Sequence, residues 1–204
     1  MPIKSDREYR NLGNLITSVD DDQTVNGYAS TFDRYLLYRD GDIDLYEQIE
    51  PTAFDGADMS DVVFLRDHTG RVLARTKNGS VTLTVDARGL LVTANLGLTE
   101  ASREMLEDIR VGNYSQMSFS FIAGSDSYEW IDERTVVRHI QNLTKLFDIS
   151  AVAFPANPFT EIGVSARSLL DGAIEEREAE RLKSEARDRK VKELALKVKL
   201  MRGV

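Results

Sequence analysis

Short apolar segments alternate with turn signals through most of this chain of 204 residues, and no other feature constrains the fold as strongly. Between Thr24 and Phe154, such segments rich in Val, Leu, Thr and aromatic residues recur every ~8–12 residues. Asn78-Gly79 and Ala87-Arg88-Gly89 separate consecutive segments in the manner of hairpin turns. The pattern predicts many short strands that form a closed or nearly closed sheet.

One helix interrupts the strands. Thr99 is a favourable N-cap, apolar side chains follow it at helical spacing as far as Ile109, and Gly112-Asn113 ends the segment. After the helix the strands resume, and Pro155–Pro158 terminates the last of them. We therefore expect a mixed α/β (α+β) fold that is mainly antiparallel.

The charge changes sign near the end of the chain. Residues 167–204 hold 11 basic and 8 acidic residues, hence +3, whereas the other 166 residues hold 15 and 26, hence −11. The basic segment contains no proline and is rich in alanine, which predicts a long helix. The expected organisation is an N-terminal arm at 1–24, a main domain at 25–167 and a helical tail at 168–204.

Composition excludes several kinds of site. The chain has no cysteine and only two histidines, His68 and His139, so disulfides, thiolate chemistry and a histidine-rich metal site are excluded, and we expect no metal or cofactor. A net charge of −8 argues against general nucleic-acid binding. No apolar run approaches the ~20 residues of a membrane span, and the polar start is unlike a signal peptide. We expect no membrane association and a location in the cytoplasm where the chain is made.

Two serines lie in the strand predicted at Gln116–Ile122. Alternation places Ser118 and Ser120 on one face, and the large apolar side chains of the strand on the other. Either the serines simply face solvent or a neighbouring strand, or one of them is a nucleophile on a rigid element.

His68 and Asp148 are the candidate partners of such a nucleophile. His68 follows an apolar strand, where it is either a surface loop residue or a general base. Asp148 lies inside an apolar strand, where burial without a partner would be costly, unless that strand is half exposed. His139 is the alternative third member, although its strand favours a structural role.

Several short motifs occur in a fixed order between about Val25 and Arg167. They are Gly27–Phe32, Ile49–Phe54, Leu65–His68, Asp86–Leu90, Ile109–Gly112 followed by Gln116–Phe121, and Phe147–Pro158. In this order they resemble the prohead maturation proteases of tailed phages. Three positions depart from the family pattern: Thr52 and Ser120 stand where the family has glycine, and Asp148 stands where it has glutamate.

The resemblance implies a fold like herpesvirus assemblin, a β-barrel surrounded by helices, with a serine–histidine catalytic pair. Ser118 matches the nucleophile and His68 the base, while Asp148 matches the third member and Ser120 is the fallback nucleophile. It also implies location inside the procapsid of the host cell, with the major capsid protein and scaffold as substrates and contact with other procapsid components. Self-processing somewhere after Ala166, which would remove the tail, and a homo-oligomer are further expectations.

Two other functions remain open at this stage. A catalytically inactive scaffolding protein on the same barrel would also carry an acidic body and a helical tail. A β-barrel binding module would explain the strands but not the ordered motifs. Convergence of Ser118, His68 and Asp148 within hydrogen-bond reach is the feature that discriminates among these functions.

Overall fold

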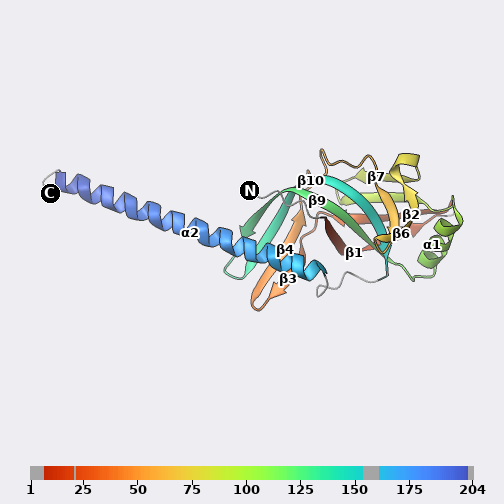
Figure 1. Cartoon of the computed structure of the whole chain (residues 1–204), viewed down its shortest axis with the longest axis horizontal. Coiled ribbons are helices and arrows are strands. Elements are labelled where there is room, and N and C mark those ends of the chain that lie inside the picture. The colour runs from red at the N-terminus through yellow and green to blue at the C-terminus, as the bar shows by residue number, and fades with distance from the viewer. Residues whose placement is uncertain (1–6, 21, 154–160, 202–204) are drawn as a thin grey trace. The chain divides into compact units, whose positions relative to one another are not determined.

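The computed structural model describes residues 7–20, 22–153 and 161–201. The chain divides into two compact units, Met1–Val164 and Ser165–Val204. The first unit contains the strands, and most of helix α2 (Glu161–Met201) makes up the second (Figure 1). The Pro155–Pro158 terminator lies outside the described residues.

Strands dominate the first unit. They are β1 (Glu8–Val19), β2 (Thr24–Thr31), β3 (Tyr35–Asp40), β4 (Ile43–Ile49), β5 (Val63–Arg66), β6 (Thr69–Arg75), β7 (Val81–Val85), β8 (Gly89–Asn95), β9 (Gln116–Trp130) and β10 (Thr135–Val152). A short 3-10 turn (Thr76–Asn78) precedes β7, and helix α1 (Glu100–Arg110) joins β8 to β9.

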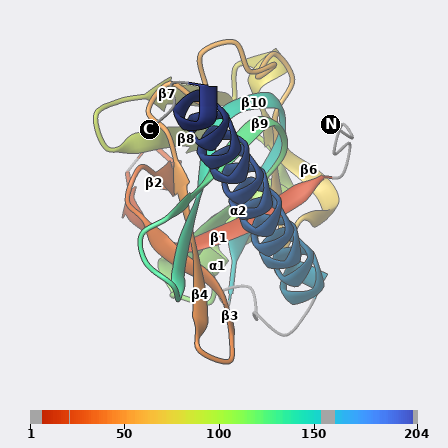
Figure 2. The same ribbon diagram turned by 90° about the vertical axis from the view of Figure 1, so that its left-hand side faces the viewer.

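The long β9–β10 hairpin is the centre of the strand order. That order is β3-β4-β10-β9-β1-β2-β8-β7, and β5 attaches to β10 and pairs with β6. Most pairs are antiparallel, but β10 runs parallel to β4 and to β5. Figures 1 and 2 show β9 and β10 side by side and the β3–β4 hairpin at one end of the strands.

The closed barrel that we expected is not found among the described strands. β3 and β7 are the end strands of the order, and they do not pair with each other, so the strand order does not close into a ring. The expected ring of helices is also absent from the described part of this unit, where α1 is the helix between strands. The mixed α+β composition itself is as predicted.

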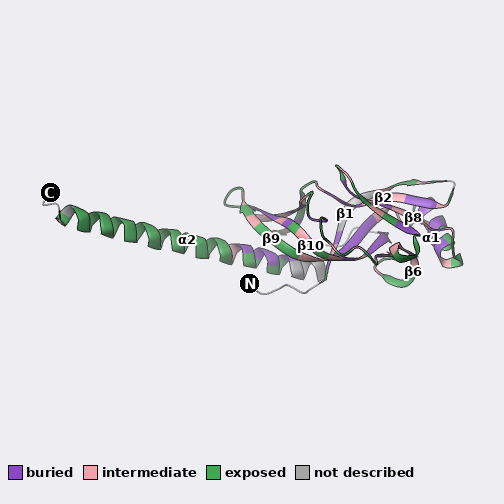
Figure 3. Ribbon diagram, turned by 90° about the horizontal axis from the view of Figure 1, so that it is seen from above, coloured by how far each residue is buried: buried purple, intermediate pink, exposed green. Residues whose placement is uncertain are grey.

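Alternation along the strands builds the core. Met117, Phe119 and Phe121 of β9 are fully buried, and Met105 and Leu106 of α1 are also buried. α1 begins where the sequence predicts, because the Thr99 side chain accepts a hydrogen bond from the backbone N–H of Ser102 at 3.2 Å. Figure 3 shows the buried residues concentrated in the strands.

The N-terminal arm is more ordered than the sequence indicated. Glu8–Val19 forms strand β1, which pairs with β9 through Glu8–Asn11 and with β2 through Ile16–Val19. Glu8 and Arg10 are buried in this strand, where ion pairs with side chains of other strands compensate their charges.

The tail is helical, as expected. α2 covers the described part of the tail predicted at 168–204, and it begins earlier, at Glu161. No helix in the described residues is long and apolar enough to cross a membrane.

Candidate active site

A strained hairpin turn presents His68. Asp67 and His68 are the two loop residues between β5 and β6, and both have left-handed backbone angles, with φ of 47° and 57°. A two-residue turn of this hand favours Gly, Asn or Asp, and a residue held in such a conformation costs on the order of 1–3 kcal/mol. The turn is tied to β10, because the Asp67 N–H donates to the Ala151 carbonyl at 3.1 Å and the His68 N–H donates to Ser150 Oγ at 3.0 Å.

Three adjacent strands bring the candidate residues together. β10 lies between β9 and β5, with Ser150 opposite Ser118 and Asp148 opposite Ser120. The turn after β5 therefore extends the His68 ring back across β10 toward β9. Its Nε2 lies 2.6 Å from Ser118 Oγ, and its Nδ1 lies 2.6 Å from Asp148 Oδ1.

The carboxylate fixes the proton on the ring. An ionised carboxylate only accepts hydrogen bonds, so neutral His68 holds its proton on Nδ1 and donates it to Asp148. Nε2 then carries the lone pair that faces Ser118. This is the tautomer in which a histidine accepts a proton from a serine hydroxyl.

Asp148 is fully buried and surrounded by donors. Its Oδ1 also accepts from Ser150 Oγ at 3.0 Å, and its Oδ2 accepts from Ser120 and from the Arg7 guanidinium. Burial alone would raise the pKa of Asp148. The hydrogen bond and charge of His68, with the bonds from Ser120 and Ser150, outweigh burial and hold that pKa below its ordinary value.

The two alternative residues have other contacts. Ser120, the fallback nucleophile, donates to Asp148 and accepts from Arg7. His139 lies on the N-terminal part of β10, where its ring meets Glu50 at 2.7 Å and Glu129 at 3.1 Å. Neither residue takes the place that Ser118 and Asp148 occupy around His68.

Three residues around the site were missed in the sequence. Ser150 shares a strand face with Asp148, so the two-residue alternation could have indicated it. Arg7 and Tyr9 carried no such signal. The Tyr9 ring packs edge-on against His68 with centroids 4.9 Å apart, and Arg7 donates to Asp148 and Ser120.

A buried ion network lies beside the site. Arg10 Nε donates to Glu47 Oε1 at 2.5 Å, and Arg138 donates to both Glu8 and Glu47 at 2.7 Å. Burial opposes ionisation of Glu47, but its two arginine partners lower its pKa to about 2. The Arg138 side chain is fully buried and also bonds Asp126 at 2.6 Å. The network anchors β1 to β4 and β10.

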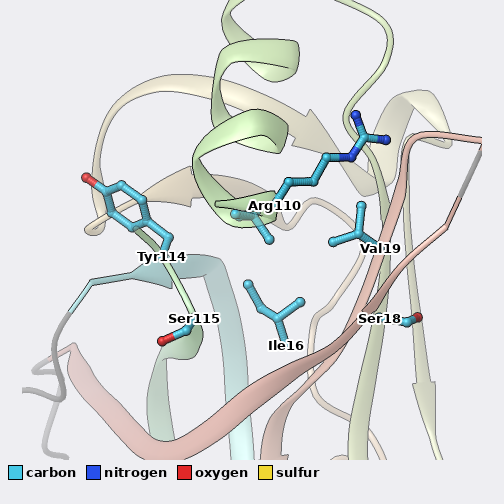
Figure 4. A pocket seen from close by; sticks show the side chains of 7 residues that line it. Ile16, Ser18, Val19, Arg110, Tyr114 and Ser115 are labelled. Atoms are coloured by element: carbon cyan, nitrogen blue, oxygen red, sulfur yellow. The ribbon is translucent and has the colours of Figure 1, made fainter. Parts of the chain in front are cut away.

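Neither of two open cavities in this unit is lined by Ser118, His68 or Asp148. One, of about 330 Å³, is lined by Ile16, Ser18, Val19, Ile109, Arg110, Tyr114 and Ser115, between β1 and the end of α1 (Figure 4). The other, of about 280 Å³, lies between the β5–β6 hairpin and α1. The described residues hold no group of three or more His, Cys, Asp or Glu arranged to bind a metal.

A serine on one nitrogen of a histidine and a buried carboxylate on the other is the arrangement used by serine hydrolases. The family model for caudovirus prohead serine proteases matches residues 14–173, which is more than half of the chain. The chain therefore belongs to that family, and the resemblance read from the ordered motifs is confirmed. No curated protein and no solved structure matches the chain.

Proposed function

We propose that this prohead serine protease acts through Ser118 as nucleophile, His68 as general base and Asp148 as the residue that orients His68. The carrying observation is the pair of 2.6 Å contacts that His68 makes, one to Ser118 and one to Asp148. Ser118 attacks the scissile carbonyl while His68 takes its proton, and an acyl-enzyme forms. His68 then protonates the leaving amine, activates a water and completes hydrolysis.

The substrates in this proposal are the scaffold or the N-terminal scaffolding segment of the major capsid protein. Cleavage takes place inside the procapsid in the host cytoplasm, together with other procapsid components. The family membership supports this assignment. Self-association of the protease is compatible with it.

The tail is proposed as a packaging segment that the protease removes from itself by a cut somewhere after Ala166. Residues 167–204 carry a net charge of +3 and lie mostly beyond the family match, which ends at residue 173. A basic helix suits an acidic scaffold surface. Mass spectrometry of mature particles should find the chain without its tail, and an intact C-terminus in active particles would contradict self-removal.

Co-expression with the cognate capsid and scaffold proteins tests the catalytic assignment. Wild-type protease should yield defined cleavage products by gel and mass spectrometry, and Ser118→Ala should yield none. Ser125→Ala, an exposed serine of the same strand, is the matched control and should cleave normally. Equal products from wild type and Ser118→Ala would remove Ser118 as nucleophile, and Ser120→Ala would then be tested. Assembled procapsids without cleavage by wild type would favour an inactive scaffolding protein.

A further inference from the structure

The proposed nucleophile is covered by the chain's own N-terminal segment. Ser118 is 3% exposed, and Ser120 and Asp148 are fully buried. The segment Arg7–Asn11 lies along this part of β9, with Asn11 opposite Ser118 and Arg10 opposite Phe119. A peptide substrate must reach Ser118, so this segment occupies a place that a substrate needs.

Three residues of the segment contact the site. The Arg7 guanidinium donates to Asp148 and to Ser120 Oγ, and the Tyr9 ring covers His68. The Arg10 carbonyl accepts a hydrogen bond from Ser118 Oγ at 2.8 Å. The segment therefore meets the nucleophile with a main-chain carbonyl, as a substrate strand would.

The contact with Ser118 is unsuited to attack. The carbonyl presents its oxygen to Ser118 Oγ as a hydrogen-bond acceptor, whereas attack requires the carbonyl carbon to face that oxygen. Ser118 has a single proton, so donation to Arg10 competes with donation to His68. Bound in this way, the segment blocks the site and is not itself aligned for cleavage.

The Arg10 side chain indicates what the site accepts. Its Nε and Nη2 donate to the two oxygens of fully buried Glu47, at 2.5 and 2.9 Å. Without the segment, the fixed charges here are Glu47, Asp126 and Arg138, which sum to one negative charge. A basic side chain in the place of Arg10 would bring that sum to zero by forming a bidentate pair with Glu47.

The family match begins at residue 14, after this segment. Arg7–Asn11 is thus an addition to the part of the chain that the family model matches. We propose that Arg7–Asn11 is an autoinhibitory strand in the place of the substrate, and that Glu47 selects substrates with a basic residue where Arg10 lies. The inference rests on the function proposed for Ser118.

The test compares the full chain with a variant lacking residues 2–11. This deletion withdraws Glu8 and Arg10 together, so the buried ion network loses one charge of each sign. Labelling of Ser118 by a fluorophosphonate should be at least tenfold faster in the variant, and Ser118→Ala should abolish labelling in both backgrounds. Arg39→Ala, which removes an exposed arginine that pairs with Asp44, is the matched control and should label at the full-chain rate.

A peptide of residues 4–13 should slow labelling of the deletion variant, and the same peptide with Glu in place of Arg10 should not. Labelling that depends on Ser118 but is unchanged by the deletion would overturn the autoinhibitory strand while leaving the proposed nucleophile in place. Absence of labelling in both folded proteins would overturn the proposed function and the inference with it. Equal inhibition by the two peptides would overturn the role of Glu47.

If the deletion variant does not fold, as judged by cooperative thermal unfolding, Arg7→Ala/Tyr9→Gly in the full chain replaces it. This variant keeps Glu8 and Arg10 in the ion network and removes the two side chains that cover Asp148 and His68. It should label several-fold faster than wild type. An unchanged rate would overturn the autoinhibitory strand.

Discussion

Replacing Asp148 by Asn should disable the site through the hydrogen-bond pattern around this carboxylate. Four donors surround it: His68 Nδ1 and Ser150 Oγ on Oδ1, and Ser120 Oγ and Arg7 on Oδ2. Asn supplies one accepting oxygen and one donating NH₂ group. Its oxygen can therefore serve either the donors at the Oδ1 position or those at the Oδ2 position, but not both.

The Arg7 side decides which way the amide turns. A guanidinium cannot accept a hydrogen bond, so the NH₂ group is repelled from Arg7 and turns toward His68. Nδ1 of His68 must then accept, which moves the ring proton to Nε2, where it can no longer receive the proton of Ser118. The expected loss is about 10⁴-fold, or about 5.5 kcal/mol at ~1.36 kcal/mol per tenfold.

A double-mutant cycle with Arg7→Ala tests this mechanism. Without Arg7, the NH₂ group can face Ser120, whose hydroxyl can accept, and the amide oxygen can return to His68. Arg7→Ala should increase the rate of Ser118 labelling in both wild type and Asp148→Asn. The fold increase in Asp148→Asn should be at least ten times the fold increase in wild type. The increase in wild type measures the effect of removing the Arg7 side chain from the site, so the additional increase in Asp148→Asn reports the change of His68 tautomer. Additive effects, or Asp148→Asn within tenfold of wild type, would refute the tautomer argument.

Other predictions concern stability. Asp67→Gly should raise the free energy of unfolding by about 1 kcal/mol, because glycine relieves the left-handed turn; a lower urea midpoint would show that the turn is unstrained. Arg138→Met should cost about 3–5 kcal/mol, because Glu8, Glu47 and Asp126 lose a shared buried partner and Arg10 alone remains to compensate Glu8 and Glu47. Arg39→Met at an exposed pair should cost about 0–1 kcal/mol, and similar urea midpoints for the two variants would contradict the network's role. The lowered pKa of Glu47 stabilises the fold above its ordinary value of 4.5, and this contribution is lost as the pH falls toward about 2. Urea midpoints should fall over that range in wild type and less steeply in Glu47→Gln, and parallel curves would exclude Glu47.

Sequence patterns indicate faces of strands but not what covers them. Alternation placed Ser118 and Ser120 together on one face of β9, and this is how they lie. Because the sequence does not give the strand order, exposure of that face to solvent remained open, yet both serines are buried. His68 and Asp148 could be nominated only through residue type and the ordered motifs. Their meeting depends on β10 lying between β9 and β5, which is a long-range pairing.

The strand β1 escaped prediction for a related reason. Its residues Glu8 and Arg10 suggest a solvated arm, because isolated charges are costly to bury. Their partners Glu47 and Arg138 come from β4 and β10, far along the chain, and the four side chains compensate one another only after folding. No local pattern carries that information.

Arg10 links this network to the proposed nucleophile. Its side chain pairs with Glu47, and its carbonyl accepts from Ser118, so the segment cannot leave Ser118 without breaking a buried ion pair. Withdrawing Arg10 would leave the buried Glu47 without this partner, which is strongly unfavourable. Only a small fraction of molecules should therefore have Ser118 uncovered in the absence of a substrate. A strand that brings its own basic residue replaces the pair as it enters and avoids that cost. If the proposed autoinhibitory strand is correct, opening should therefore depend on the local concentration of a strand that carries a basic residue in this place.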